Sequence, residues 1–177
     1  MAIGACPILP WQGYAWRAHK RRYEATDWRG SLRVSGRYHR GADRFPQEQI
    51  WPALYLGLTY GICLAEIARH LTPVLFSQLK EYRFSRIKLD LVAVVDCRSL
   101  GEMRLTPEEL FEDFDYEVGQ NLAIAARTLR CEGMLVPSAA RLPDDILIIF
   151  PDLVRPQSSL RLEESVDPVL YVQRPGD

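Results

Sequence analysis

The chain has 177 residues, of which 47% are hydrophobic and 25% charged, and its formal net charge is −1. This is ordinary for one soluble globular domain, and the length suffices to bury about 70% of the surface that the unfolded chain exposes. No apolar run approaches the roughly 20 residues that span a bilayer, and the first residues lack the basic and apolar regions of a signal peptide. We therefore expect a cytoplasmic protein without membrane contact.

Taken in chain order, the hydrophobic pattern predicts strands and helices that do not alternate regularly. Strands are predicted at 13–22, 53–58, 82–96, 134–136 and 146–150, with a last pair at 160–164 and 169–172. A helix is predicted after Thr59, a second from Thr72-Pro73 to about residue 80, a third from the capping box at Thr106, and a longer one over 117–130.

The order of these elements favours an α+β fold over a doubly wound one, because the strands are mostly not joined by single regular crossovers. We expect a single domain over residues 1–177, with a twisted mixed β-sheet core and flanking helices. Its core would cover about 14–152, and edge strands would follow at 158–173. The stretch 102–117 holds seven acidic residues and one arginine, and we interpret it as a solvated face rather than a site.

Residue types that often carry chemistry are scattered. No C-x-x-C pair occurs, and the three histidines are far apart, so we expect no metal site. The four cysteines are interpreted as reduced thiols that act as small apolar filler: Cys6, Cys63, Cys97 and Cys131. No glycine-rich phosphate loop and no G-x-S-x-G motif occurs, so the residues alone define no reaction.

The first quarter of the chain is strongly basic although the whole is nearly neutral. Nine basic and three acidic residues lie between Arg17 and Arg44, a local charge of +6 that leaves −7 for the other residues. Arginine binds phosphate or carboxylate oxygens bidentately. Five aromatic residues are interleaved with these charges: Trp16, Tyr23, Trp28, Tyr38 and Phe45. The pattern indicates a ligand with phosphates and aromatic bases, which leaves nucleic acid and a dinucleotide as candidates.

Four fragments carry a further signal through their order and spacing. They are Trp16-Arg17, SGRYH at 35–39, ALYL at 53–56 followed by LAE at 64–66, and VPSAAR at 136–141 ahead of ILIIF at 146–150. The arginines of the first two are 20 residues apart, and the tyrosine and glutamate of the third are 11 apart. Together they resemble the RES-domain family, named for its arginine, glutamate and serine, over about residues 14–152.

This resemblance implies a fold like that of ADP-ribosyltransferase toxins. Family members are toxins of bacterial toxin–antitoxin pairs that destroy NAD by cleaving its nicotinamide–ribose bond. NAD would therefore be the substrate, with no metal, and the protein partner would be an antitoxin, usually an Xre-type helix-turn-helix protein. A homo-oligomer is compatible with the sequence, and no direct nucleic-acid contact is expected.

The resemblance also places five residues in the pocket: Arg17, Arg37, Tyr55, Glu66 and Ser138. Of these, Glu66, Arg37 and Ser138 would be catalytic, and all except Glu66 would bind NAD. His39 would contact the same ligand, and Arg141 would lie near it. The sequence differs from the usual family pattern in having Tyr38-His39 where tryptophan-asparagine is commoner.

Physical chemistry agrees with these roles. Cleavage leaves an oxocarbenium-like ribose, whose positive charge a carboxylate stabilises. Glu66 lies in an apolar helical stretch, where its field acts more strongly than in water; the alternative is an exposed glutamate pairing with Arg69 or His70. Arg17 and Arg37 are predicted to grip the pyrophosphate from neighbouring strands.

The remaining site residues have structural alternatives as well. Tyr55 would stack on nicotinamide and offer its hydroxyl to a ribose or phosphate oxygen, or it would be a core aromatic. Ser138 would place its hydroxyl against the ribose or carboxamide, or it would be an ordinary turn residue. Any one arginine of the basic quarter is by itself most often a surface residue.

Several functions remain open at this level. Transfer of ADP-ribose to water would make the protein a glycohydrolase, transfer to phosphate a phosphorylase, and transfer to a protein side chain an ADP-ribosyltransferase. From other classes, a nucleic-acid-binding module would use the basic quarter on a phosphate backbone. A catalytically inactive homologue that forms complexes would fit the altered Tyr38-His39 pair.

Overall fold

The computed structural model describes residues 3–70, 79–112 and 115–169. Its strands are β1 Ile8–Lys20, β2 Leu54–Gly57, β3 Tyr82–Asp96, β4 Gly133–Pro137, β5 Asp145–Ile149 and β6 Ser159–Val166. Its α-helices are α1 Tyr60–His70, α3 Pro107–Leu110 and α4 Glu117–Thr128. Four short 3₁₀ helices complete the described elements: η1 Ile3–Ala5, η2 Arg29–Leu32, η3 Gln47–Gln49 and η4 Pro151–Leu153.

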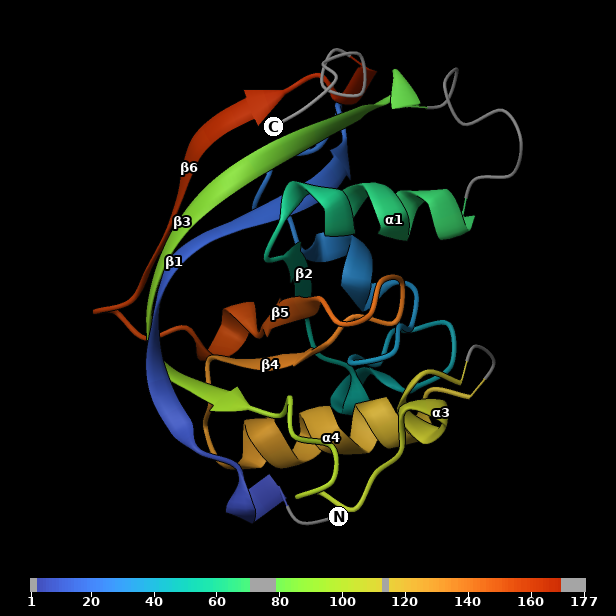
Figure 1. The fold of residues 1–177 in the computed structure, drawn as a ribbon, viewed down its shortest axis with the longest axis vertical. Helices are drawn as coiled ribbons and strands as arrows, with labels where there is room; N and C mark the ends of the chain where they lie inside the picture. Colours follow the sequence, from blue (N-terminus) through green and yellow to red (C-terminus); the bar gives the residue numbers. More distant parts are fainter. Residues whose placement is uncertain (1–2, 71–78, 113–114, 170–177) are drawn as a thin grey trace.

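The described strands form one mixed sheet that closes on itself. Their order is β1-β2-β5-β4-β3-β6, and β1 also pairs with β3, so the first five strands form a ring with β6 outside it. Strands β3 and β4 run parallel, and the other described pairs are antiparallel. Figure 1 shows the long β1, β3 and β6 curving together along the left side, with β2, β5 and β4 in the middle of the view. The predicted single α+β unit with a mixed sheet is confirmed for the described residues.

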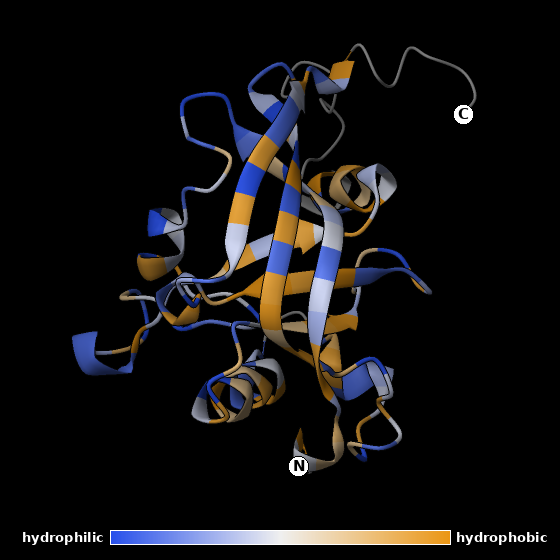
Figure 2. Cartoon of the chain, turned by 90° about the vertical axis from the view of Figure 1, so that its left-hand side faces the viewer, coloured by the Kyte–Doolittle hydropathy of each residue, from blue (hydrophilic) through white to orange (hydrophobic). Residues whose placement is uncertain are grey.

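The long strand β3 is built as its sequence pattern predicts. Its middle part alternates, so that Ile87, Leu89 and Leu91 are buried while Lys88 and Asp90 are exposed. Figure 2 shows the same alternation of hydrophobic and hydrophilic residues along the outer strands. Ala93, Val94 and Val95 near the end of β3 are apolar and buried, because there the strand lies between β1 and β4.

Two helices cover different parts of the sheet. The buried face of α4 includes Leu122, Ala123 and Ala126, which share one core cluster with residues of β4 and β5. Helix α1 buries Cys63 and Ile67 against a smaller cluster near β1 and β3. Between the strands, a third cluster joins leucines and isoleucines of β2, β3 and β5. Because α1 is fixed to β1 and β2 through these contacts, its orientation also sets where its polar side chains point.

Two of the helix starts predicted from capping residues, at Thr59 and Thr106, are confirmed. The hydroxyl oxygen of Thr59 accepts the N–H of Ile62 (3.4 Å) at the start of α1. Thr106 and Glu109 form the reciprocal capping box of α3. However, α3 ends after one turn, and α4 ends at Thr128 rather than 130, because Arg130 adopts a positive φ of 58°.

Other element bounds differ from the predictions by several residues. The first strand begins at Ile8 instead of residue 13, because its early residues pair with the end of β3. The predicted edge strand at 160–164 is β6, whereas Val169 belongs to a helical turn and 170–172 lie outside the described residues. The second predicted helix, from Thr72-Pro73 to about residue 80, also lies almost wholly outside them.

Candidate functional site

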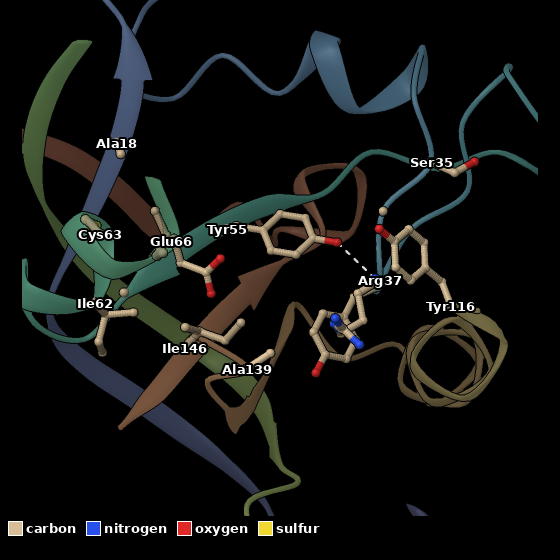
Figure 3. Close-up of a pocket in the computed structure, with 14 residues that line it drawn as sticks. Ala18, Ser35, Arg37, Tyr55, Ile62, Cys63, Glu66, Tyr116, Ala139 and Ile146 are labelled. Carbon is tan, nitrogen blue, oxygen red and sulfur yellow. Dashed lines mark hydrogen bonds between the residues drawn. The ribbon is translucent and has the colours of Figure 1, made fainter. Parts of the chain in front are cut away.

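A cavity of about 400 Å³ lies between α1, β2, the turn at 35–38 and the start of α4 (Figure 3). We call it the Glu66 cavity. Its wall combines one carboxylate, one guanidinium and aromatic rings with an apolar floor. The lining residues used below are Ala18, Arg37, Tyr38, Tyr55, Cys63, Glu66, Tyr116 and Ala139.

Glu66 enters this cavity from α1. The helix is held against β1 by Cys63, which also lines the cavity: this residue is buried, and its thiol donates a hydrogen bond to the carbonyl of Trp16 (3.2 Å). Glu66 is half-buried, and Figure 3 shows its carboxylate pointing into the cavity. The alternative pairing with Arg69 or His70 involves side chains outside the described part of the chain.

Arg37 faces the cavity from a tight turn. The turn is closed by a reciprocal pair of backbone hydrogen bonds between Gly36 and His39. A Cβ at Gly36 would lie 2.5 Å from the His39 ring, so this close approach requires glycine. The prediction that Arg37 lies on a strand next to that of Arg17 is therefore wrong: the polar stretch before Pro46 folds into turns and the short 3₁₀ helix η2 instead.

The guanidinium of Arg37 is oriented by the loop between α3 and α4. Its Nη1 donates to the carbonyls of Leu110 (2.7 Å) and Glu112 (2.8 Å), and its Cζ lies 5.5 Å from the ring centre of Tyr116. Behind it, α4 packs so closely that a Cβ on Gly119 would lie 2.4 Å from the carbonyl oxygen of Arg37. The interpretation of 102–117 as a solvated face is thus corrected, because this stretch supplies both an anchor and a wall of the cavity.

Tyr55 presents its ring to the cavity, while its hydroxyl is bonded within the protein. The hydroxyl oxygen accepts the N–H of Tyr38 (2.9 Å), marked in Figure 3, and lies 2.9 Å from Nδ1 of His39. The other ring nitrogen of His39, Nε2, lies 2.8 Å from the carbonyl of Val34 and must carry the proton, since a carbonyl only accepts. Nδ1 therefore accepts a hydrogen bond from the hydroxyl of Tyr55. Burial lowers the pKa of His39, which favours this neutral form, and burial raises that of Tyr55.

Arg17 does not line the Glu66 cavity. It lies in a second, larger cavity of about 720 Å³, whose wall shares Ala18 and Tyr55 with the first. Its guanidinium donates to the carbonyls of Ala25 (2.6 Å) and Asp27 (2.6 Å), and so holds the segment that follows β1. Burial lowers the pKa of Arg17 to about 10, against the opposing effect of Asp27, and the group stays protonated at neutral pH.

Ser138 directly follows β4, as its position in the sequence predicts, but its side chain is fully buried. Its hydroxyl oxygen accepts the N–H groups of Ala140 (3.2 Å) and Arg141 (3.3 Å), a pattern typical of a turn. The neighbouring Ala139 lines the Glu66 cavity. Arg141 is exposed and paired with Asp144 (3.2 Å).

The predicted site residues thus fall into three groups. Glu66, Arg37 and Tyr55 share one cavity, and His39 is hydrogen-bonded to Tyr55 from outside it. Arg17 lies in the adjoining cavity, which His39 also lines, and Ser138 is buried next to a lining residue of the first cavity.

Tyr116 was missed by the sequence reasoning. It is the residue just before α4, and an aromatic residue at a helix start within an acidic stretch was the signal available for it. Metal ligands do not gather here: among residues 3–70, 79–112 and 115–169, no group of three or more His, Cys, Asp or Glu side chains is placed to hold a metal ion.

The fold and site define a class before any comparison: a single α+β domain whose closed mixed sheet carries a ligand cavity with a carboxylate and an oriented arginine. The family follows from sequence. The RES domain model matches residues 14–167, which is most of the chain, and the protein belongs to the RES domain family. No curated protein sequence matches significantly.

A solved structure agrees with this assignment. The chain is similar to one from the crystal structure of the MbcT–MbcA toxin–antitoxin complex of M. tuberculosis, with a TM-score of 0.77 and 25% sequence identity. The match covers 97% of this chain and 93% of the other. Separately, none of the described helices is both long and apolar enough to cross a membrane.

Proposed function

We propose that this protein is the toxin of a toxin–antitoxin pair and that it cleaves the nicotinamide–ribose bond of NAD, which depletes the cell of NAD. The observation that carries the proposal is the meeting of Glu66, Arg37 and the Tyr55 ring in one cavity. Membership of the RES domain family and the similarity to a chain of a toxin–antitoxin complex support it. The ADP-ribosyltransferase-like fold expected from the family belongs to the same proposal.

In this proposal, Glu66 stabilises the reacting ribose. Loss of neutral nicotinamide leaves positive charge at C1′ of the ribose, and a carboxylate in a partly desolvated cavity stabilises that charge more strongly than one in water. The ring of Tyr55 would stack on nicotinamide. Because the hydroxyl of Tyr55 already donates its hydrogen bond to His39, Tyr55 would act mainly through its ring.

Arg37 would bind phosphate at the other side of the cavity. The carbonyls of Leu110 and Glu112 hold its guanidinium in place before a substrate arrives, so less conformational freedom is lost on binding. Arg17, in the adjoining cavity, would contribute positive charge and hold the segment after β1. Ser138 would act by shaping the loop that places Ala139 in the wall.

The acceptor of ADP-ribose decides between reaction types: water gives a glycohydrolase, phosphate a phosphorylase, and a protein side chain an ADP-ribosyltransferase.

The nucleic-acid-binding alternative is weakened because many basic residues of the first quarter have internal partners. Arg17 is bonded to backbone carbonyls, Arg29 to Asp27, and Arg40 lies 4.5 Å from the Phe45 ring centre. The protein partner in this proposal is an antitoxin, and an Xre-type helix-turn-helix protein is the kind that the family resemblance implies.

The test is mass analysis of the products formed from NAD by the purified protein, with and without phosphate. We expect free nicotinamide, and ADP-ribose or its phosphorylated form identifies the acceptor. Glu66→Ala or Arg37→Ala should lower the rate by about a hundredfold or more, as when one electrostatic stabiliser is lost. Glu163→Ala and Arg161→Ala, at exposed positions of β6, are the matched controls. Intact NAD after long incubation with folded protein would contradict the proposal.

A further inference from the structure

The second cavity, about 720 Å³, lies between the end of β1 and the segment 22–33. We call it the basic cavity. It shares Ala18 and Tyr55 with the Glu66 cavity, so the two are neighbours on either side of one wall. An elongated ligand with two distinct halves would fill both, whereas a small one would fill either alone.

The charges around the basic cavity favour an anion. Five lining residues are cationic: Arg17, Lys20, Arg22, Arg29 and Arg33. Two lining residues are acidic, Glu24 and Asp27. Asp27 is bound by Arg29, with 2.9 Å between Nε and Oδ1. An anion that enters this cavity therefore meets an excess of positive charge.

Two of these cations are available to a ligand. Within the described part of the chain, Arg22 and Arg33 form no ion pair, and both are exposed at the cavity. By contrast, Lys20 lies 3.9 Å from Glu81, and Arg17 is held by backbone carbonyls. Two unpaired guanidinium groups beside one cavity suit the oxygens of a phosphate, which arginine binds bidentately.

Aromatic residues of the same cavity favour a nucleoside over a bare phosphate. Trp28 is half-buried and packs against the core cluster between the strands, so its ring is fixed by the fold. Tyr23 is exposed, and the guanidinium of Arg22 lies over its ring at 4.9 Å. Flat rings next to arginines are the features that stack on the bases of nucleotides.

We infer that the basic cavity binds a phosphorylated adenosine group, as the adenosine monophosphate half of NAD, while the nicotinamide ribose occupies the Glu66 cavity. The inference rests on the proposed function for the identity of the whole ligand. Arg22 and Arg33 contact the phosphate, and Trp28 stacks on the adenine. Binding of this remote half orients the bond that is cleaved, since interactions away from the reacting atoms contribute to positioning.

The kinetic test compares NAD with nicotinamide mononucleotide, which lacks the adenosine half. We expect the wild type to prefer NAD in kcat/KM by about tenfold or more, which corresponds to one charge-assisted contact. The double variant Arg22→Ala/Arg33→Ala should lose most of this preference through a higher KM for NAD, with unchanged cleavage of the mononucleotide. Arg161→Ala, outside both cavities, is the control. Equal kcat/KM for the two substrates in the wild type would overturn the inference and leave the proposed function intact.

A binding test separates the inference from catalysis. Calorimetry with adenosine monophosphate should detect binding to the wild type, weaker binding to the double variant, and weaker binding to Trp28→Leu. If NAD is not cleaved but this pattern is seen, the proposed function fails and the nucleotide site stands. If adenosine monophosphate does not bind, or if inorganic phosphate binds equally well and Trp28→Leu has no effect, the site for a nucleoside is refuted.

Discussion

Gly119→Ala is expected to displace Arg37 in the Glu66 cavity, because α4 packs against Arg37 at this glycine. An alanine in a helix interior is intrinsically favoured over glycine by about 1 kcal/mol. At Gly119, however, the new Cβ would lie 2.4 Å from the carbonyl oxygen and 2.9 Å from Cγ of Arg37. Overpacking of this kind costs about 1–3 kcal/mol, because backbone must move to relieve it. We expect a net loss of up to about 2 kcal/mol in the free energy of unfolding.

The movement should also reach the reaction, since Arg37 faces Glu66 across the cavity. A small displacement of a substrate-binding group lowers kcat/KM strongly, and we expect about tenfold or more for NAD. Denaturant unfolding and NAD turnover measure the two effects. Gly101→Ala is the control, because an added Cβ there meets nothing within 4 Å. A Gly119→Ala variant that is more stable than the wild type and equally active would refute the reasoning.

Two further predictions concern buried titratable groups. Burial lowers the pKa of His39, so below about pH 6.5 the unfolded chain binds a proton at this residue more readily than the folded protein does. The free energy of unfolding should therefore fall as the pH drops below about 7. Denaturant unfolding at pH 7.5 and 5.5 should show a smaller fall for His39→Gln than for the wild type, and an equal fall would contradict this role of His39. Glu132 is fully buried and accepts the N–H groups of Val92 (2.6 Å), Ala93 (2.9 Å) and Arg155 (2.7 Å). Glu132→Ala should therefore lower the free energy of unfolding by about 3–5 kcal/mol, whereas the exposed control Glu163→Ala should leave it nearly unchanged. A loss below about 1 kcal/mol for Glu132→Ala would show that these hydrogen bonds contribute little to stability. Burial raises the pKa of Glu132, but the hydrogen bonds from the Ser158 hydroxyl and from these three N–H groups outweigh it, so the pKa lies below its usual value of 4.5. The stability that the ionised carboxylate contributes is therefore present above about pH 4.5 and is lost as the pH falls further, which the same unfolding assay at pH 3 measures.

Elements with a strong local pattern were predicted well from the sequence. The alternation in β3 and the capping box at Thr106 depend on residues close together in the chain, and both were found. Pairing between distant strands has no such local signal. The closure of the sheet by β1 and β3, and the early start of β1 at Ile8, became visible only in the structure.

The candidate site was predicted in part for the same reason. Fragment order and spacing named Glu66, Arg37 and Tyr55, which share a cavity. The targets of long polar side chains depend on how loops fold back, and local pattern does not contain this information. The carbonyls that hold Arg17 and the placement of Tyr116 are examples.

The hydrogen bonds at the Tyr55 hydroxyl have a consequence for which ligand conformations fit the protein. The ring of Tyr55 lines both the Glu66 cavity and the basic cavity, and its hydroxyl is hydrogen-bonded to the backbone N–H of Tyr38 and to His39. A side chain that is hydrogen-bonded at its far end does not rotate away freely when a ligand enters. The distance between the two cavities is therefore set when the protein folds, and a ligand that occupies both must adopt a conformation that matches it.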